Sequence, residues 1–170
     1  MQTLDLSLPE PAHNLACDEI LLDEVNEKRR EPVLRFWESR THLVVLGYGN
    51  SIKRECDTVS CQRLDIPILC RISGGGAVLL GPGCLNYSIV MRIAPGRADQ
   101  SVNATNCRIM AMHREAIGRA LAQAIEVQGY TDLTWGGFKF SGNAQRRRRN
   151  SMLFHGLFCW VLTWHCSNKP

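Results

Sequence analysis

No apolar run in this sequence reaches the length of about 18 residues that a membrane-spanning helix requires, and the most apolar stretch, residues 152–164, is broken by polar residues. The first eleven residues carry Asp5 and Glu10 but no basic residue, unlike the start of a secretory signal peptide. These absences predict a protein that is not secreted and has no membrane partner. The expected compartment is the cytoplasm, or the mitochondrial matrix if the source is a eukaryote, although no transit peptide is evident.

The eight cysteines form no CxxC pair, and none of their spacings matches a standard zinc site. Cys56 and Cys61 lie five positions apart, and a second group, near the end of the chain, includes His155 and Cys159. Because a chain without a secretory signal is expected in a reducing compartment, we interpret the cysteines as free thiols. The sequence therefore predicts neither disulfides nor a metal site.

Two common nucleotide-binding motifs are also missing around the glycine run at 74–76. The glycines are contiguous and no Lys-Ser or Lys-Thr pair follows them, which excludes a dinucleotide fingerprint and a Walker loop. Three glycines in a row are costly in a strand, because glycine loses the most backbone entropy on folding. The run lies between apolar, strand-like segments, and Arg71 precedes it by three positions. It predicts a backbone ledge that a ligand can approach closely or, as the simpler alternative, a β-bulge or turn.

Lysine is scarce in the second half of the chain. Lys139 is the only lysine between Lys53 and Lys169, although the chain has 20 basic residues. It lies between Phe138 and Phe140, with Gly-Gly before them and Ser-Gly after them. This setting predicts a semi-buried lysine that its neighbours hold in place. The alternative is an exposed strand lysine whose alkyl chain covers the phenyl rings.

The hydrophobic pattern predicts a single α+β domain over residues 1–170, with strands clustered between two long helices. The helices are expected at 11–30 and 105–127, with a shorter one at 56–64. Loops are expected at 47–54 and 94–103. The predicted strands are 33–37, 43–47, 68–72, 77–80, 85–93, 131–134, a segment around 139, and 152–164.

The two long helices are each expected to bury one side. In the first, Cys17, Leu21 and Val25 recur every four positions, whereas the acidic residues, Asp18 among them, are expected to face water. In the second, the expected apolar stripe begins with Ile109 and continues through Met112, Ala116, Ile117, Ala120, Leu121 and Ala124.

The formal charge of +4 owes much to four consecutive arginines at 146–149. Such a run can bind nucleic acid, but no aromatic residue lies within it to stack on bases. We therefore expect a solvated turn or a patch for an acidic protein partner, and no nucleic acid.

Several segments together resemble the lipoate–protein ligase A and octanoyltransferase family. They are NLACDEILL, LRFW, VVLGYGNS, RISGGGAV, LNYSIV and KFSGNAQ, and the ordered pair RISGGGAV and KFSG is the most specific. The resemblance covers residues 4–156. It implies a mixed, largely antiparallel sheet flanked by helices, as in the biotin/lipoate ligase (class II synthetase-like) catalytic domain. Past residue 156 the family pattern fades, so we expect a domain that is incomplete at its C-terminus and has no accessory domain.

The resemblance implies a lipoate–protein ligase. Such an enzyme uses ATP with Mg²⁺ to activate lipoate or octanoate as an acyl-adenylate (lipoyl-AMP). It then transfers the acyl group to a lysine of a lipoyl domain in 2-oxoacid dehydrogenase complexes, or of the glycine-cleavage H protein, and a separate accessory subunit can assist. By the same resemblance Lys139 is the catalytic residue, between the acyl carboxylate and the α-phosphate. The implied binding residues are Arg71, Gly74, Gly75, Gly76, Ala77, Val78, Leu79, Asn86 and Lys139, with no protein metal site.

Three alternatives stay open at this point. The first is an ATP-independent octanoyltransferase that forms a cysteine thioester, with Cys84 or Cys107 as candidate nucleophiles. It gains weight because Leu80 and Gly81 stand where ligases of this family often carry His-Asp. The second is a non-catalytic protein- or RNA-binding module built on the arginine run. The third is a degenerate family member that binds acyl-adenylate or acceptor without turnover, a reading that the shortened C-terminus supports.

Overall fold

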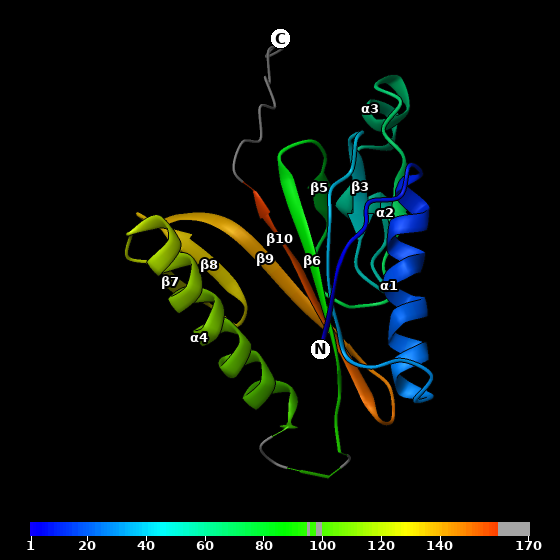
Figure 1. Ribbon diagram of the computed structural model, residues 1–170. Helices are drawn as coiled ribbons and strands as arrows, with labels where there is room; N and C mark the ends of the chain where they lie inside the picture. The colour runs from blue at the N-terminus through cyan, green and yellow to red at the C-terminus, as the bar shows by residue number, and fades with distance from the viewer. Residues whose placement is uncertain (95, 98–99, 160–170) are drawn as a thin grey trace.

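The computed structural model describes residues 1–94, 96–97 and 100–159, and these fold into two β-sheets with helices packed against them (Figure 1). Within these residues the larger sheet has seven strands, in the order β1-β2-β6-β10-β9-β8-β7, and the smaller has three, in the order β4-β3-β5. The pairs β1–β2 and β3–β4 are parallel, and the other strand pairs are antiparallel. The predicted α+β class is therefore confirmed.

The elements follow one another along the chain with short connections. They are β1 (Gln2–Asp5), α1 (Pro11–Asn26), β2 (Val33–Trp37), β3 (Leu43–Leu46), α2 (Ile52–Glu55), α3 (Thr58–Arg63), β4 (Ile68–Cys70), β5 (Val78–Leu80), β6 (Cys84–Arg92), α4 (Val102–Leu121), β7 (Glu126–Gln128), β8 (Asp132–Trp135), β9 (Phe138–Arg147) and β10 (Ser151–Cys159).

The larger sheet is covered on both faces (Figure 1). Successive side chains of a strand point to opposite faces, so in β10 Leu153 packs with the apolar side of α1 whereas Phe154 packs with α4. The smaller sheet lies on the α1 face, where its Val45 and Leu80 pack against Trp37 of the larger sheet. Burial on both faces explains why the central strands read as continuous apolar runs.

Helix α4 differs from its prediction in both extent and orientation. It ends at Leu121 because Ala122 adopts a left-handed conformation with φ of 51°, and the chain then forms β7 where helix was predicted. Its buried residues are Thr105, Ile109 and Met110, whereas Met112 is 62% exposed. Of the predicted stripe, Ile109 is buried and Ile117 packs against the core, whereas Met112 and Leu121 are exposed, so the prediction was right only in part. No helix in the described part of the chain is long and apolar enough to cross a membrane.

The arginine run is not a free basic patch. Strand β9 extends through Arg147, whose guanidinium donates to the Gln100 carbonyl at 2.6 Å, at the start of α4. Arg148 pairs with Asp23 of α1 at 2.7 Å, and Arg146 lies over the Tyr48 ring at 5.3 Å. Of the four, Arg149 is the exposed one. Three of these side chains therefore fasten the β9–β10 hairpin to neighbouring elements, which contradicts the prediction of a solvated turn, whereas the partner patch stays a prediction.

Strand β1 and helix α2 were not predicted. Strand β1 is a short edge strand that pairs with β2 in parallel, and its residues are mostly exposed, so it carries little hydrophobic pattern. Helix α2 is a single turn within the predicted loop at 47–54 and buries no residue. Both elements are set by tertiary pairing and local turns, which apolar periodicity does not report.

Candidate active site

A cavity of about 300 Å³ lies between the two sheets. Its floor is the α1 face of the larger sheet, where Trp37, Asn86 and Leu157 stand in one row across neighbouring strands. Its roof is the smaller sheet with the glycine run, which we call the glycine loop (residues 73–77). Leu15 and Asp18 of α1 close one end, and Lys139 and Asp132 stand at the other. An apolar slot thus leads to a charged end.

Lys139 reaches the cavity from β9 and is paired with a carboxylate. Its Nζ lies 2.8 Å from Oδ2 of Asp132, which belongs to the neighbouring strand β8. The Lys139 side chain is 57% exposed, so the prediction of a semi-buried lysine was wrong. The Lys139 side chain lies over Gly142, where an added Cβ would be in ordinary van der Waals contact with Cε at 3.5 Å. The result is an oriented ammonium group that an incoming anion can reach.

Arg71 does not point its donors at open space but clamps the glycine loop. Its Nη2 donates to the carbonyls of Gly74 at 2.7 Å and Gly76 at 2.9 Å, and its Nη1 donates to Val45 at 3.1 Å. Its Nε donates to the Ser73 hydroxyl at 3.1 Å. Burial lowers the pKa of the Arg71 guanidinium, and these contacts compensate for the lost water. Arg71 therefore shapes the loop with three of its five N–H groups, and a fourth ties it to β3.

The three glycines of the loop serve different purposes. Gly75 has a φ of +93°, and a Cβ there would lie 2.9 Å from the Arg71 guanidinium, so Gly75 is needed for the turn itself. Gly76 has open space beside it and lines the cavity. Gly47, on the adjacent segment, permits close approach, because its Cβ would lie 2.0 Å from the Gly75 carbonyl oxygen. The turn interpretation is confirmed for Gly75, and the ligand ledge stays a prediction, for which Gly76 is the residue in place.

We expect Gly76→Val to weaken binding of an acyl-adenylate analogue about tenfold or more, because its three added carbons would occupy part of the cavity that Gly76 lines. Gly74→Val is the matched control, since a Cβ at Gly74 also meets open space but Gly74 does not line the cavity. Titration calorimetry on both variants measures the two affinities. Equal affinities would show that the glycines only form the turn.

A buried polar cluster backs the floor of the cavity. Arg35, which is fully buried, donates to Asp18 Oδ1 at 2.8 Å, and the Ser88 hydroxyl donates to Asp18 Oδ2 at 2.6 Å. Asp18 was expected to face water and is instead 3% exposed. The expectation failed because α1 carries its one inward carboxylate on the same side as Leu22 and Val25, where it neutralises the buried arginine.

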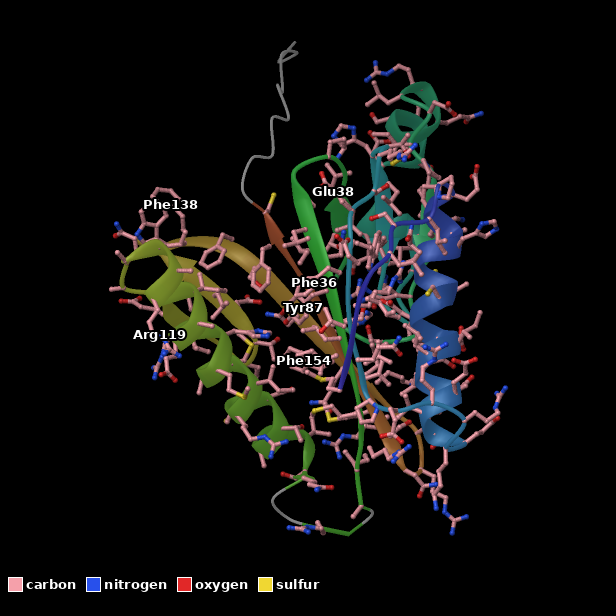
Figure 2. The ribbon with its side chains drawn as sticks, viewed as in Figure 1. Phe36, Glu38, Tyr87, Arg119, Phe138 and Phe154 are labelled. Carbon is pink, nitrogen blue, oxygen red and sulfur yellow. The ribbon has the colours of Figure 1, made fainter. Side chains whose placement is uncertain are left out.

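The opposite face of the floor is held by a second cluster, which Figure 2 shows around Tyr87. The Tyr87 hydroxyl donates to Asn143 Oδ1 and lies 3.2 Å from His113 Nδ1 of α4. Burial lowers the pKa of His113 to about 4, so the ring is neutral at pH 7. The Asn143 side chain lies directly against Gly156. A Cβ at Gly156 would lie 1.8 Å from Asn143 Oδ1. The glycine of the His-Gly pair is therefore required for packing.

The candidate nucleophilic cysteines both lie away from the cavity. Cys84 is fully buried, 3.5 Å from the sulfur of Cys159 on β10, and burial raises the pKa of the Cys84 thiol to about 12. Cys107 is exposed on α4, on the far face of the larger sheet. Among the described residues, none of those that line the cavity is a cysteine.

Most of the predicted site residues meet in this cavity. Gly74 is not among those that line it, and Leu79 lines a second cavity, of about 340 Å³, beneath α3. Asn86 uses its amide N–H groups on the Trp37 and Cys84 carbonyls. The described residues contain no cluster of three His, Cys, Asp or Glu side chains suited to a metal. The predicted residues that do line the cavity are Arg71, Gly75, Gly76, Ala77, Val78, Asn86 and Lys139.

Some site residues could not be singled out from the sequence. Asp132, Asp18 and His155 line the cavity and had no predicted role in the site. For Asp132 the signal was weak, because its pairing with Lys139 depends on a register shift between β8 and β9. For Asp18 and His155 a signal existed, since both are polar residues at positions where the pattern of the element points inward.

Comparisons with known proteins agree with this geometry. Residues 10–162 match the family model described as the lipoyl protein ligase A/B catalytic domain. The octanoyltransferase LipM of Moorella thermoacetica is 29% identical over 171 residues, which cover 90% of this chain and 62% of that protein. Lipoate–protein ligase 1 of Staphylococcus aureus is also 29% identical, over 88% of this chain and 43% of its own length.

Solved structures share the fold. A crystal structure of lipoate-protein ligase A bound with ATP superposes with a TM-score of 0.79 at 24% identity, covering 92% of this chain and 65% of that one. The chain thus spans only part of the length of these similar proteins. Because a transferase and a ligase are equally identical to it, sequence identity does not decide between the two reactions.

Proposed function

This chain belongs to the lipoyl protein ligase A/B catalytic domain family, and we propose that it is a ligase-type member, which activates lipoate or octanoate with ATP and transfers it to a protein lysine. The observation that carries the proposal is the charged end of the cavity. Lys139 stands there beside the glycine loop, and the described lining residues include no cysteine that could carry a thioester. A thioester route needs such a nucleophile within reach of the acyl carbonyl.

The proposed first step joins two anions. The acyl carboxylate attacks the α-phosphorus of ATP, the bond to the β-phosphate oxygen breaks, and pyrophosphate leaves. A fixed positive charge lowers the barrier where negative charge gathers, and the ammonium of Lys139 is a compact charge that can contact both reactants. Asp132 holds it in place until they arrive.

In the second step the amine of an acceptor lysine attacks the acyl carbonyl and AMP leaves. The acyl chain fits the apolar slot, which Val45, Val78, Leu80 and Leu157 line. Burial of such a chain contributes about 0.8 kcal/mol per CH₂. The floor and roof of the slot thus select an extended aliphatic acid, and its carboxylate emerges beside Lys139.

Mg²⁺ suits this site as a companion of ATP. It typically binds substrate phosphates together with one or two carboxylates and several waters, and Asp132 is the carboxylate beside Lys139. In this arrangement Asp132 would hold the ion, which would neutralise phosphate charge.

The proposed acceptors are lipoyl domains, such as those of 2-oxoacid dehydrogenase complexes or the glycine-cleavage H protein. The name of the Staphylococcus aureus relative, a lipoate–protein ligase, supports a protein acceptor. A separate accessory subunit is part of the proposal, supported by a solved structure titled as a bi-partite lipoate protein ligase with its E2 lipoyl domain from Thermoplasma acidophilum.

Mass spectrometry of a lipoyl domain tests the function directly. The acceptor is incubated with this protein and lipoate, with or without ATP, and separately with octanoyl acyl carrier protein. We expect a lipoyl mass increment only with ATP, together with pyrophosphate release. An octanoyl increment without ATP would instead assign the octanoyltransferase reaction, and no increment under any condition would favour a non-catalytic binding module or a degenerate member that binds without turnover.

We expect Cys84→Ser and Cys107→Ser each to keep acyl transfer close to the wild-type rate, because neither sulfur lines the cavity. The assay is the rate of acceptor modification, with intact-mass spectra of the enzyme recorded in parallel. Loss of transfer in either variant, with an octanoyl thioester on that residue in the wild type, would move the protein to the transferase reaction.

A further inference from the structure

We propose that His155 is a positioning residue that fixes the glycine loop over the floor of the cavity, through a hydrogen bond to Ser73. Its consequence for acyl binding rests on the function proposed above. His155 Nε2 lies 2.6 Å from the Ser73 hydroxyl, and its Nδ1 lies 3.5 Å from Asp18 Oδ2. The contact joins β10 of the larger sheet to the loop that extends from the smaller one.

The sequence places His155 at this point through strand register. Arg35, Ser88 and His155 are directly opposite one another on β2, β6 and β10, so their side chains share the face that α1 covers. Asp18 of α1 contacts all three, at 2.8 Å, 2.6 Å and 3.5 Å respectively. His155 is thus the last member of a polar row whose other members are buried and satisfied, and its ring is only 12% exposed.

The donor and the acceptor can be assigned for each hydrogen bond that links His155, Ser73 and Arg71. Ser73 is fully buried, and its oxygen accepts from Arg71 Nε at 3.1 Å. Nδ1 of His155 faces the Asp18 carboxylate, which only accepts, so we assign the ring proton to Nδ1, and Nε2 then accepts from the Ser73 hydroxyl. Arg71 in turn holds the Gly74 and Gly76 carbonyls. His155 therefore supports Ser73, Ser73 supports Arg71, and Arg71 shapes the loop that roofs the cavity.

The same geometry argues against His155 as a general base for the acceptor lysine. A base needs a free nitrogen lone pair toward the reacting amine. Nε2 is occupied by a serine that solvent does not reach, and Nδ1 faces a carboxylate. The histidine consequently acts on the distance between loop and floor rather than on a proton of the substrate.

Two isosteric variants separate the two ring contacts. His155→Gln places its amide group near the position of Nε2, where the amide oxygen can accept from the Ser73 hydroxyl, whereas His155→Asn reaches only the position of Nδ1. We expect hydrogen exchange in the peptide covering residues 71–78 to rise about tenfold in the Asn variant, as for loss of one hydrogen bond. The Gln variant should recover most of that protection. Ser73→Ala removes the contact from the other side and should expose the same peptide if His155→Asn does not fold.

Steady-state kinetics on the same proteins provides the second readout. The Asn variant should raise the KM for lipoate about tenfold and change kcat much less, with the Gln variant between it and wild type. If the Asn and Gln variants both lose kcat while loop exchange and KM stay at wild-type values, His155 is a base and the positioning proposal is wrong. Unchanged loop exchange in His155→Asn or Ser73→Ala overturns it as well. Since exchange needs no substrate, an inactive wild-type protein would refute the proposed function and leave this test intact.

Discussion

Lys139→Ala is expected to lower kcat for acyl-adenylate formation by at least about 100-fold, since removing one preorganised group at a developing charge typically costs about 3 kcal/mol. Without the ammonium, the acyl carboxylate and the α-phosphate must approach each other against their own repulsion. Asp132, now without its partner, adds a third negative charge at the same end of the cavity. Pyrophosphate release measures the first step, and acceptor modification measures both.

The fold should survive this substitution, because the Lys139 side chain is 57% exposed. Lys53→Ala, at an exposed lysine of the short helix α2, controls for the loss of one positive charge. Lys139→Ala with near wild-type pyrophosphate release would remove Lys139 from the mechanism. A fall of similar size in Lys53→Ala would mean that the overall charge is responsible.

The sequence was sufficient to predict the elements that are apolar and regular. Strand β2 was predicted with its observed bounds, Val33–Trp37, and most other central strands to within a few residues. These strands are buried on both faces, so their composition alone identifies them. The glycine run and Lys139 were also identified, because three adjacent glycines and an isolated lysine are rare and need a reason.

What the sequence did not reveal depends on pairs of residues far apart in the chain. The partners Asp132 and Lys139 meet across the β8–β9 hairpin, whose register is irregular. Arg146, Arg147 and Arg148 read as one basic run, yet the end of β9 and the turn after it direct them to different neighbours. The local sequence shows that a residue is charged, but the face of the sheet that it occupies depends on the strand register.

Asp18 shows the same limit most clearly, although a clue was present. Val33, Arg35 and Trp37 alternate along β2 and are all buried, so the pattern placed an arginine in the core. A buried guanidinium requires a carboxylate, and Asp18 lies on the inward side of α1 with Leu22 and Val25. Treating every acidic residue of α1 as solvent-facing missed that requirement.

This buried pair supports the remaining prediction, that Arg35→Met destabilises the folded protein by about 3–5 kcal/mol. The substitution leaves Asp18 as an uncompensated charge at 3% exposure and removes donors from the Leu6 and Asn14 carbonyls. Urea denaturation followed by circular dichroism gives the free energy of unfolding. Arg30→Met is the matched control, since Arg30 also pairs with a carboxylate of α1, Glu24 at 2.5 Å, but is 34% exposed. It should cost less than about 1 kcal/mol.

A double-variant cycle distinguishes stability lost with the Arg35–Asp18 charge pair from stability lost with packing. Asp18→Asn alone should also be costly, because it strands the Arg35 guanidinium, whereas Arg35→Met combined with Asp18→Asn removes both charges. If the pair acts as a unit, the double variant should be more stable than the sum of the two single losses predicts, by about 0.5–3 kcal/mol. Simple additivity would mean that Arg35 matters for its carbonyl contacts and its volume. In that case Asp18 serves the floor of the cavity through Ser88 and His155 rather than by neutralising the arginine.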